Sequence, residues 1–363
     1  MHPSFRPIAL ALAALVVASG CAAGAASLAP SAAPSTAPSA NPSADPSTAP
    51  AASLSGTLTI YSGREEELIA GFVDTFRAES GIEVQVKYGS TSELAATILE
   101  EGDASPADLF LAQDAGALGA IAAEGRLIAL PQATLDRVEP RFRSDAGVWV
   151  GVTGRARVAA YDTRVLTEAD LPSSILDFVD PKWRGKLAWA PTNGSFQAFV
   201  TALRILRCDE AAKAWLEGIQ ANEPKVYESN GAIVAAIAAG EAQVGFVNHY
   251  YVLRQIAEQG ESFPVRNFWF DAADPGALVN VAGIGILTTA PNPTAAQAFL
   301  DAALSTEGQT YFSTGESEYP LVPEVQAPSG LTPLDELGSP DIDLSDLSDL
   351  SGTLKIMQEA GVL

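Results

Sequence analysis

The chain has 363 residues, with 21 basic and 44 acidic side chains and a formal net charge of −23 at pH 7. So large an excess of negative charge argues against binding to nucleic acid and against electrostatic docking on anionic lipid. The whole chain has two cysteines and two histidines, which excludes a disulfide framework and a metal site built mainly from soft ligands.

Residues 1–21 have the pattern of an export signal. A short polar start containing Arg6 precedes an apolar run at residues 8–17, and small residues then lead to Cys21. The run is shorter than the about 20 apolar residues of a transmembrane helix. The ending resembles a bacterial lipobox, so we predict that Cys21 is lipidated and anchors the exported chain to the outer face of the cell membrane. An ordinary signal peptide is the alternative.

Residues 22–56 form a segment made almost entirely of Ala, Ser, Pro, Thr and Gly, in which Asp45 is the only charge. Such a composition buries too little apolar surface to offset the entropy that is lost on ordering. We therefore predict a disordered linker between the lipid anchor and the folded part of the chain.

Short apolar strands and amphipathic helices alternate in the first folded region. Strands are expected at residues 58–61, 82–88 and 107–112, and helices at residues 64–79, 91–99 and 115–124. This order predicts a mainly parallel sheet covered by helices. Ligands of such sheets bind beyond the carboxyl ends of the strands, where Glu65 and Gln113 lie beside Arg64 and Asp114.

A long extended segment at residues 149–161 leads to a second region of the same kind. Its strands are expected at residues 187–189, 226–229, 243–247 and 279–287, and its helices at 195–206, 211–220, 232–239, 251–258, 293–304 and 306–312, before a last amphipathic helix with Leu347, Leu350, Leu354 and Ile356. The predicted fold is α/β, with two lobes that form a clamshell around crossing hinge strands. We expect lobe 1 to comprise residues 57–157 and 281–331, and lobe 2 to comprise residues 158–280 and 332–363.

Tyr250 and Tyr251 stand side by side where the strand at residues 243–247 meets the next helix. Consecutive side chains of a strand point to opposite faces, but at a helix start they are only about 100° apart and can converge on one point. Two phenolates are hard anionic ligands, which suit ferric iron better than copper or zinc. A phenol has a pKa near 10, so a bound trivalent cation would have to ionise it. The alternative is that the pair serves only for packing.

Other motifs point to no further chemistry. The acidic segment at residues 341–352 lacks the sixth-position Gly and the twelfth-position Glu of an EF-hand, and we interpret it as a cap of the last helix. No phosphate-binding loop or nucleophile elbow occurs, so an enzyme is not predicted. We interpret His249 as a supporting or structural residue, since one histidine cannot make a zinc site, and Cys208 as a buried thiol.

A series of short motifs follows in a fixed order from Leu58, and the similarity that they carry covers essentially everything from Leu58 to Leu363. They lie at residues 58–64 (LTIYSGR), 88–91 (YGST), 101–108 (EGDASPAD), 153–158 (TGRARV), 180–183 (DPKW), 190–195 (APTNGS), 248–251 (NHYY) and 274–283. Together they resemble the iron(III) solute-binding proteins of bacterial ABC importers, the ferric-ion-binding or bacterial-transferrin family. The resemblance implies a periplasmic-binding-protein (type II) fold and Fe3+ as the transported ligand.

The resemblance also assigns metal ligands by position. The central tyrosine pair of the family falls on Tyr250 and Tyr251. Glu65 stands where well-studied members have a histidine ligand, and Gln113 stands where they have a glutamate ligand. A carboxylate is still a hard oxygen donor, whereas a neutral amide is a weaker one. We therefore expect Gln113 to be the less certain ligand, with water or Asp114 able to take its place.

The same family members hold a synergistic anion, phosphate or carbonate, opposite the tyrosines. By position its contacts fall on Asn193, Gly194, Asn230 and Asn248. Backbone N–H groups at the helix start after Asn193 favour an anion there. The extra tyrosine that some relatives use is not expected, because Phe196 occupies that place.

Three arginines are candidates to balance the charge of such an anion, namely Arg64, Arg155 and Arg157. Two phenolates and Glu65 already match the three positive charges of Fe3+, so an added anion would need further positive charge. For Arg155 and Arg157, a solvated position on the hinge strand is the alternative.

The sequence thus predicts a monomeric exported protein that binds ferric iron and delivers it to the permease and ATPase of an ABC importer. The alternative within transport is capture of an organic or phosphorylated anion in the same cleft, with the two tyrosines as stacking walls. From other classes of protein, a two-lobed transferase-like enzyme and an adhesion scaffold are the remaining hypotheses.

Overall fold

The computed structural model describes residues 54–328 and 331–363. The predicted export signal with Cys21, and almost all of the predicted linker, lie outside them. The strands are β1 (Thr57–Ser62), β2 (Glu83–Tyr88), β3 (Leu109–Ala112), β4 (Trp149–Asp162), β5 (Leu187–Trp189), β6 (Lys225–Val226), β7 (Val244–Asn248), β8 (Val265–Phe268), β9 (Val279–Ile286) and β10 (Tyr319–Pro320).

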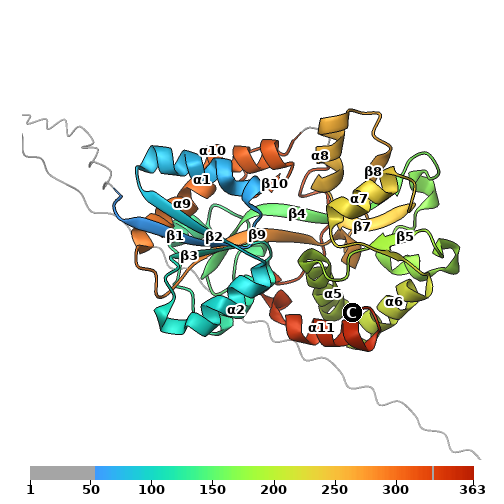
Figure 1. The fold of residues 1–363 in the computed structure, drawn as a ribbon, viewed down its shortest axis with the longest axis horizontal. Coiled ribbons are helices and arrows are strands. Elements are labelled where there is room, and N and C mark those ends of the chain that lie inside the picture. The colour runs from blue at the N-terminus through green and yellow to red at the C-terminus, as the bar shows by residue number, and fades with distance from the viewer. Residues whose placement is uncertain (1–53, 329–330) are drawn as a thin grey trace, which may run out of the picture. The chain divides into compact units, whose positions relative to one another are not determined.

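The helices of the described residues are α1 (Glu66–Ser80), α2 (Thr91–Glu101), α3 (Ala115–Ala123), α4 (Gln132–Leu135), α5 (Gly194–Arg207), α6 (Asp209–Ala221), α7 (Asn230–Ala238), α8 (Tyr250–Gln259), α9 (Pro293–Ala303), α10 (Thr306–Thr310) and α11 (Leu350–Glu359) (Figure 1). None of these helices combines the length and the apolar character that crossing a membrane requires. Helices and strands therefore alternate along most of the chain, as predicted.

The described strands form one mixed sheet. Its order is β2-β1-β3-β9-β4-β7-β5-β6, and β8 and β10 also pair with β4. β1 is parallel to β2 and β3, and β5 is parallel to β6 and β7, as expected for strands joined through helices. In the middle, β9 is antiparallel to β3 and β4, and β4 is antiparallel to β7. The prediction of a mainly parallel sheet was thus right for the outer strands and wrong for the middle of the sheet. There β4 and β9 run in opposite directions.

β4 is shared by the two halves of the sheet. Its residues 149–156 pair with β9, and its residues 157–161 pair with β7. Figure 1 shows β4 and β9 side by side between two groups of helices. All 14 residues of β4 are buried. The extended crossing segment predicted at residues 149–161 is therefore confirmed.

Apolar side chains of the described residues pack in three clusters. The first surrounds β1, β3, β9 and the start of β4, with the rings of Phe72 and Phe299 5.2 Å apart between centroids. The other two pack against β5, β7 and the end of β4, where the rings of Phe178 and Phe246 are also 5.2 Å apart. Burial of these side chains drives the folding of each half.

The C-terminal segment contributes to two of these clusters. Leu344 and Leu347 belong to the first cluster, and Ile356 and Met357 of α11 belong to the second. Leu347 lies in a 3-10 turn before α11, so its predicted place on the last helix was wrong. The lobe boundaries given above stay a prediction.

Two other local predictions can be compared with the structure. The acidic cap is confirmed, because Asp349 accepts a hydrogen bond from the backbone N–H of Gly352 (2.9 Å) at the start of α11. Cys208 is exposed and not buried as predicted. It lies at the break between α5 and α6 with a φ of 83°.

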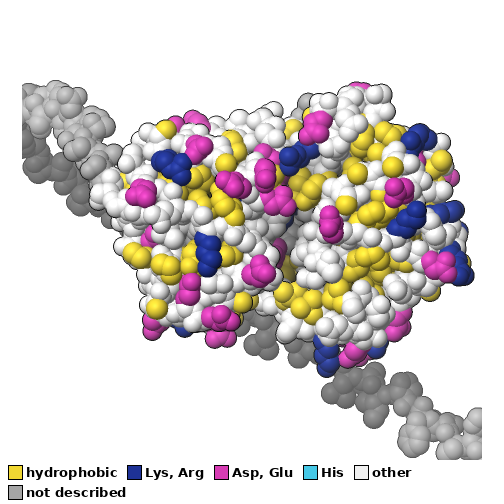
Figure 2. Space-filling model, in the orientation of Figure 1, with side chains coloured by type: hydrophobic (Ala, Val, Ile, Leu, Met, Phe, Trp, Pro, Cys, Tyr) yellow, Lys and Arg dark blue, Asp and Glu magenta, His cyan; other side chains and the backbone are white. Residues whose placement is uncertain are grey.

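Acidic side chains are scattered over the face of the molecule in Figure 2, among basic and apolar ones. They do not gather in one patch on that face. The negative charge on that face belongs to the solvated surface and does not mark a binding site.

Candidate metal and anion site

Tyr250 and Tyr251 are the first two residues of α8 and follow directly on β7 and His249. Their rings are stacked, with centroids 4.4 Å apart and planes at 27°. The Tyr250 ring is buried, and its hydroxyl has no hydrogen-bond partner within the described part of the chain. The predicted strand-to-helix junction is therefore present, and it places two phenols next to each other.

Tyr250, Glu65 and Arg155 all affect the pKa of the Tyr251 phenol. Burial raises the pKa of the Tyr251 phenol, and the neighbouring phenol of Tyr250 and the carboxylate of Glu65 raise it further, while Arg155 lowers it. The ring also packs near the start of α7, where a Cβ at Gly231 would lie 3.8 Å from its Cδ1 atom. Tyr251 therefore keeps its proton at neutral pH unless a cation displaces it.

Glu65 is the last residue of the loop after β1, and Gln113 is the first residue after β3. Glu65 is exposed and makes no capping hydrogen bond at the start of α1, and its charge reaches Tyr251. The Oε1 atom of Gln113 is buried without a partner among the described residues, while its backbone N–H donates to Thr91 Oγ1 (3.1 Å). Both side chains thus keep an uncommitted oxygen.

Asp114, considered above as a replacement ligand for Gln113, has a structural role instead. Its carboxylate caps α3, since Oδ1 accepts from the backbone N–H of Ala117 (3.2 Å). Burial raises its pKa, and Arg155 and the capping hydrogen bonds oppose this rise. This structural role makes Asp114 a poor substitute for Gln113.

No group of three or more His, Cys, Asp and Glu side chains is placed to hold a metal ion in residues 54–328 and 331–363. A metal near Tyr250 and Tyr251 would therefore need the phenol oxygens themselves. Phenolates and one carboxylate are hard donors, which suit a highly charged cation and disfavour copper(I) and zinc.

Three of the predicted anion contacts meet where two helices begin. Asn193 caps α5, and its Oδ1 accepts from the N–H and the hydroxyl of Ser195 (3.1 and 2.6 Å) and from Nδ2 of Asn230 (3.3 Å). Asn230 is the first residue of α7. Gly194 is exposed, with no atom within 4 Å of where a Cβ would stand. Two helix N-termini with open space beside them favour an anion.

Arg64 is not available to balance an anion, contrary to the prediction. Its guanidinium makes a bidentate pair with Glu318, with Nη1–Oε1 at 2.8 Å and Nη2–Oε2 at 3.1 Å. Both side chains are buried. The pair joins the loop after β1 to the segment before β10.

Arg155 and Arg157 are buried at 2% and 3% exposure, so the alternative of a solvated hinge strand is wrong. Arg157 donates to Ser195 Oγ (3.4 Å) and to the carbonyl of Phe246 (3.2 Å), and it lies 5.5 Å from the ring of Phe199. Burial lowers the pKa of Arg157 to about 9, with Tyr251 opposing the change. Arg157 therefore remains charged at neutral pH.

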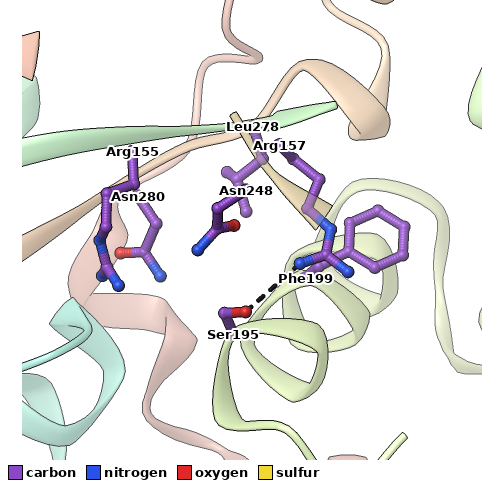
Figure 3. Close-up of a pocket in the computed structure, with 7 residues that line it drawn as sticks. All are labelled: Arg155, Arg157, Ser195, Phe199, Asn248, Leu278 and Asn280. Atoms are coloured by element: carbon purple, nitrogen blue, oxygen red, sulfur yellow. Dashed lines mark hydrogen bonds between the residues drawn. The ribbon is translucent and has the colours of Figure 1, made fainter. Parts of the chain in front are cut away.

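A small cavity lies where β4, β7, β9 and α5 meet. It has a volume of about 10 Å3 and is lined by Arg155, Arg157, Ser195, Phe199, Asn248, Leu278 and Asn280 (Figure 3). Asn248 thereby lies beside Ser195, the partner of Asn193. The structure thus brings all four predicted anion contacts into one neighbourhood.

The sequence model for the family described as bacterial extracellular solute-binding protein matches residues 71–335. The chain belongs to this family. A solute-binding family is a transport family and not a family of enzymes. This agrees with a site made of amides, phenols and arginines.

Relatives of this solute-binding protein have names or descriptions that refer to iron. The Fe(3+)-binding periplasmic protein of Serratia marcescens is 34% identical, with 86% of this chain and 92% of the relative covered. Iron-bound HitA from Pseudomonas aeruginosa is 35% identical with a TM-score of 0.80, covering 84% of this chain and 99% of that one. The Trichodesmium protein IdiA (FutA), in complex with iron and citrate ligands, is 28% identical with a TM-score of 0.73, covering 85% and 100%. The predicted resemblance and the predicted two-lobed type II fold are confirmed.

Sequence reasoning missed three residues of this neighbourhood. Ser195 stands inside a recognised motif, but its role as the partner of Asn193, Asn230 and Arg157 depends on the meeting of α5 and α7. Asn280 is a polar residue within an apolar strand, which is a weak signal that could have been used. Glu318 is one of 44 acidic residues and carries no signal of its own.

His249 has the structural role that was considered for it. Its Nδ1 accepts from the backbone N–H of Ala156 (3.2 Å), and its Nε2 donates to the carbonyl of Ser317 (2.9 Å). Its ring packs on Tyr319 at a centroid distance of 4.8 Å. Burial lowers its pKa to about 4, so the imidazole is neutral and joins β4 to the segment before β10.

We expect His249 to make the protein lose stability in mild acid. Its pKa falls from 6.5 to about 4 on folding, so between these values the unfolded chain binds a proton that the folded chain does not. The stability is complete above pH 6.5, and roughly 3 kcal/mol is lost as the pH falls to 4. Urea unfolding across this range, compared between the wild type and His249→Asn, measures the loss. If the free energy of unfolding fell equally with pH in both proteins, His249 would not be the cause of the loss.

Proposed function

We propose that this solute-binding protein captures ferric iron outside the cytoplasm and delivers it to the permease and ATPase of an ABC importer. The observation that carries the proposal is the stacked pair of Tyr250 and Tyr251, with Glu65 acting on it electrostatically. The Fe(3+)-binding periplasmic protein of Serratia marcescens and iron-bound HitA support the same ligand.

The chemistry of capture follows from the protonation of these groups. The raised pKa of Tyr251 keeps its proton on the phenol without metal, and Fe3+ would displace phenol protons as the oxygens bind. Two phenolates and the Glu65 carboxylate then balance the three charges of the ion. Gln113 Oε1, with no partner among the residues that the structure describes, is the neutral oxygen that we assign to the remaining protein position.

An anion would complete the coordination from the other side. We assign it to Asn193, Gly194, Asn230 and Asn248, beside the starts of α5 and α7. Phosphate, carbonate and a citrate carboxylate share the oxyanion chemistry that suits this place, and a relative that holds iron with citrate supports it. The bound ligand would then favour the closed state, in which the two lobes have moved together about β4 and β9.

Titration of iron-free protein with ferric citrate tests the proposal. We expect a visible charge-transfer band that grows to one equivalent of iron and disappears on acidification or with excess chelator. Acid removes the band because protons compete with iron for the two phenol oxygens. A protein that stays colourless throughout contradicts the proposal.

A second candidate is capture of an organic or phosphorylated anion, and the buried arginines Arg155 and Arg157 favour it. The tyrosines would then serve as walls of the site. Thermal unfolding of chelator-treated protein with such anions separates the two functions. Strong stabilisation without iron, together with no effect of ferric citrate, would support this candidate over the first.

We also propose that the protein is exported, anchored through lipid on Cys21 and monomeric. Cys21 and almost all of the linker lie outside the described residues, so the sequence pattern supports this part. The periplasmic relative supports export. Fractionation of cells that express the wild-type chain or its Cys21→Ser variant tests the lipid anchor. We expect the wild-type chain to stay in the membrane fraction and the variant to leave it.

A further inference from the structure

Residues 316–318 form a short segment just before β10 that contacts groups on both sides of the candidate metal site. The Oε2 atom of Glu316 lies 3.4 Å from Nη1 of Arg254. The carbonyl of Ser317 accepts a hydrogen bond from Nε2 of His249 (2.9 Å). Arg254 is a residue of α8, and His249 directly precedes this helix. The segment is therefore attached to the helix that carries both tyrosines.

The third residue of the segment, Glu318, is attached to the other side of the site. Its bidentate pair with Arg64 is almost fully buried, and Arg64 is the neighbour of Glu65 in the chain. Separating this pair would leave buried charges without partners, which is costly. The segment therefore links the loop that ends with Glu65 to the start of α8.

The contact with Arg254 acts on the face of α8 that carries Tyr250. Arg254 comes four residues after Tyr250, and side chains with this spacing are neighbours on one face of a helix. The Tyr250 hydroxyl is buried and has no hydrogen-bond partner among the described residues. The position of this oxygen therefore depends on how α8 is held.

The backbone of the segment is strained. Ser317 has a φ of 57°, in the left-handed region that residues with a side chain seldom adopt. A π-helical turn at Tyr311–Gly315 comes shortly before it, and such turns are frequent at functional sites. A strained backbone persists only where the surrounding structure holds it. Glu316 and Glu318 supply such contacts on the two sides of Ser317.

The contact between Glu316 and Arg254 is the weakest of the three. It is a single approach of one nitrogen to one oxygen, and Oε2 of Glu316 makes no hydrogen bond within the described part of the chain. The side chain of Arg254 is 37% exposed, whereas that of Glu316 is 12% exposed. Burial raises the pKa of Glu316, and Arg254 opposes this rise. A partly exposed pair of this kind can be broken without unfolding the chain.

We propose that the segment 316–318 positions the two sides of the iron site, and that its contact with Arg254 sets how long iron stays bound. The segment keeps Tyr250 and Glu65 at the spacing that a bound ion requires. This role rests on the proposed function, because the segment supplies no ligand and acts through groups that we assign to iron. A site that is held ready before its ligand arrives loses less entropy on binding. Loss of the contact should therefore appear mainly as faster release.

Release of iron from the loaded protein to an excess of chelator, followed as loss of the visible band, tests the proposal. Arg254→Met should release iron about 10-fold faster than the wild type, as expected for a group that orients a metal ligand. Glu316→Gln should do the same. The double variant should be no faster than either single variant, because all three lack the same contact.

Arg254→Lys should release iron like the wild type. It keeps the positive charge, and a single contact does not need the planar fork of arginine. Denaturant unfolding of each variant separates positioning from packing, since a merely structural role lowers the stability and leaves the release rate unchanged. If Arg254→Met does not fold, Glu316→Gln breaks the same contact from the other side.

Lys213→Met is the matched control. Lys213 pairs with Glu359 (3.3 Å) between α6 and α11, and its side chain is 37% exposed, as is that of Arg254. This pair takes no part in the candidate site, so its loss should leave the release rate unchanged.

Two results overturn the proposal while the proposed function stands. One is a wild type that forms the visible band while Arg254→Met and Glu316→Gln release iron at the same rate as Lys213→Met. The other is a double variant in which the effects of the two single changes add up. A wild type that forms no band with ferric citrate contradicts the proposed function itself and removes the positioning role with it.

Discussion

Replacing Tyr250 and Tyr251 together by Phe is expected to abolish the visible band that ferric citrate produces, while the protein still folds. The change removes two oxygens and almost no volume, so the stacked rings at the start of α8 remain packed. Loss of a group that only orients a metal ligand already costs about 10–100-fold in affinity. Each single variant should therefore weaken iron binding by more than about 100-fold, as measured by competition with a chelator.

Tyr227→Phe is the matched control for these variants. Its hydroxyl donates to Glu241 (3.0 Å) on the surface and does not take part in the candidate site. This variant should bind iron like the wild type and show the full band. An unchanged band in the double variant would assign iron to other residues and leave Tyr250 and Tyr251 as packing residues.

Glu318→Gln is expected to destabilise the protein by about 3–5 kcal/mol, because it leaves the buried guanidinium of Arg64 without its partner. Both side chains of the pair are almost fully buried, at 1% and 0% exposure. Replacing the two together, as Arg64→Met with Glu318→Leu, removes both buried charges and should recover most of the loss. Denaturant unfolding of the wild type, Arg64→Met, Glu318→Leu and their double variant gives the coupling free energy of the pair.

The pH dependence of the same pair has a definite sign. Burial raises the pKa of Glu318, but the charge and hydrogen bonds of Arg64 outweigh it and hold the pKa below 4.5. The stability from this pair is therefore complete above pH 4.5 and is lost as the pH falls through the lowered pKa. The difference in the free energy of unfolding between the wild type and Glu318→Gln should therefore become smaller in that acid range. A constant gap, or a small effect of the single change at neutral pH, would contradict the role of the pair.

Local patterns were enough to predict most of the elements of this fold. The apolar alternation at residues 82–88 and the apolar face of α1 predict β2 and α1, because their burial depends on neighbours in sequence. The Tyr250–Tyr251 junction was also predictable, since it follows from a strand that ends where a helix begins. The direction of β9 was not, because it depends on pairing with β3 and β4 far away in the chain.

The charges of the site were harder to predict than its position. Arg64 looked like a free cation until the structure placed Glu318 against it, 254 residues away in sequence. For the basic residues of the TGRARV motif, a solvated position was the alternative because charged side chains usually lie in solvent, yet β4 buries them. Which of Tyr250, Tyr251, Glu65 and Gln113 touch iron stays a prediction.

Diffraction from iron-loaded crystals, recorded at the iron absorption edge, tests the central claim most directly. We predict one anomalous peak per molecule, at bonding distance from the hydroxyl oxygens of both Tyr250 and Tyr251. A peak bound elsewhere, or loaded crystals in which both hydroxyls remain without metal, would contradict ferric capture by this pair.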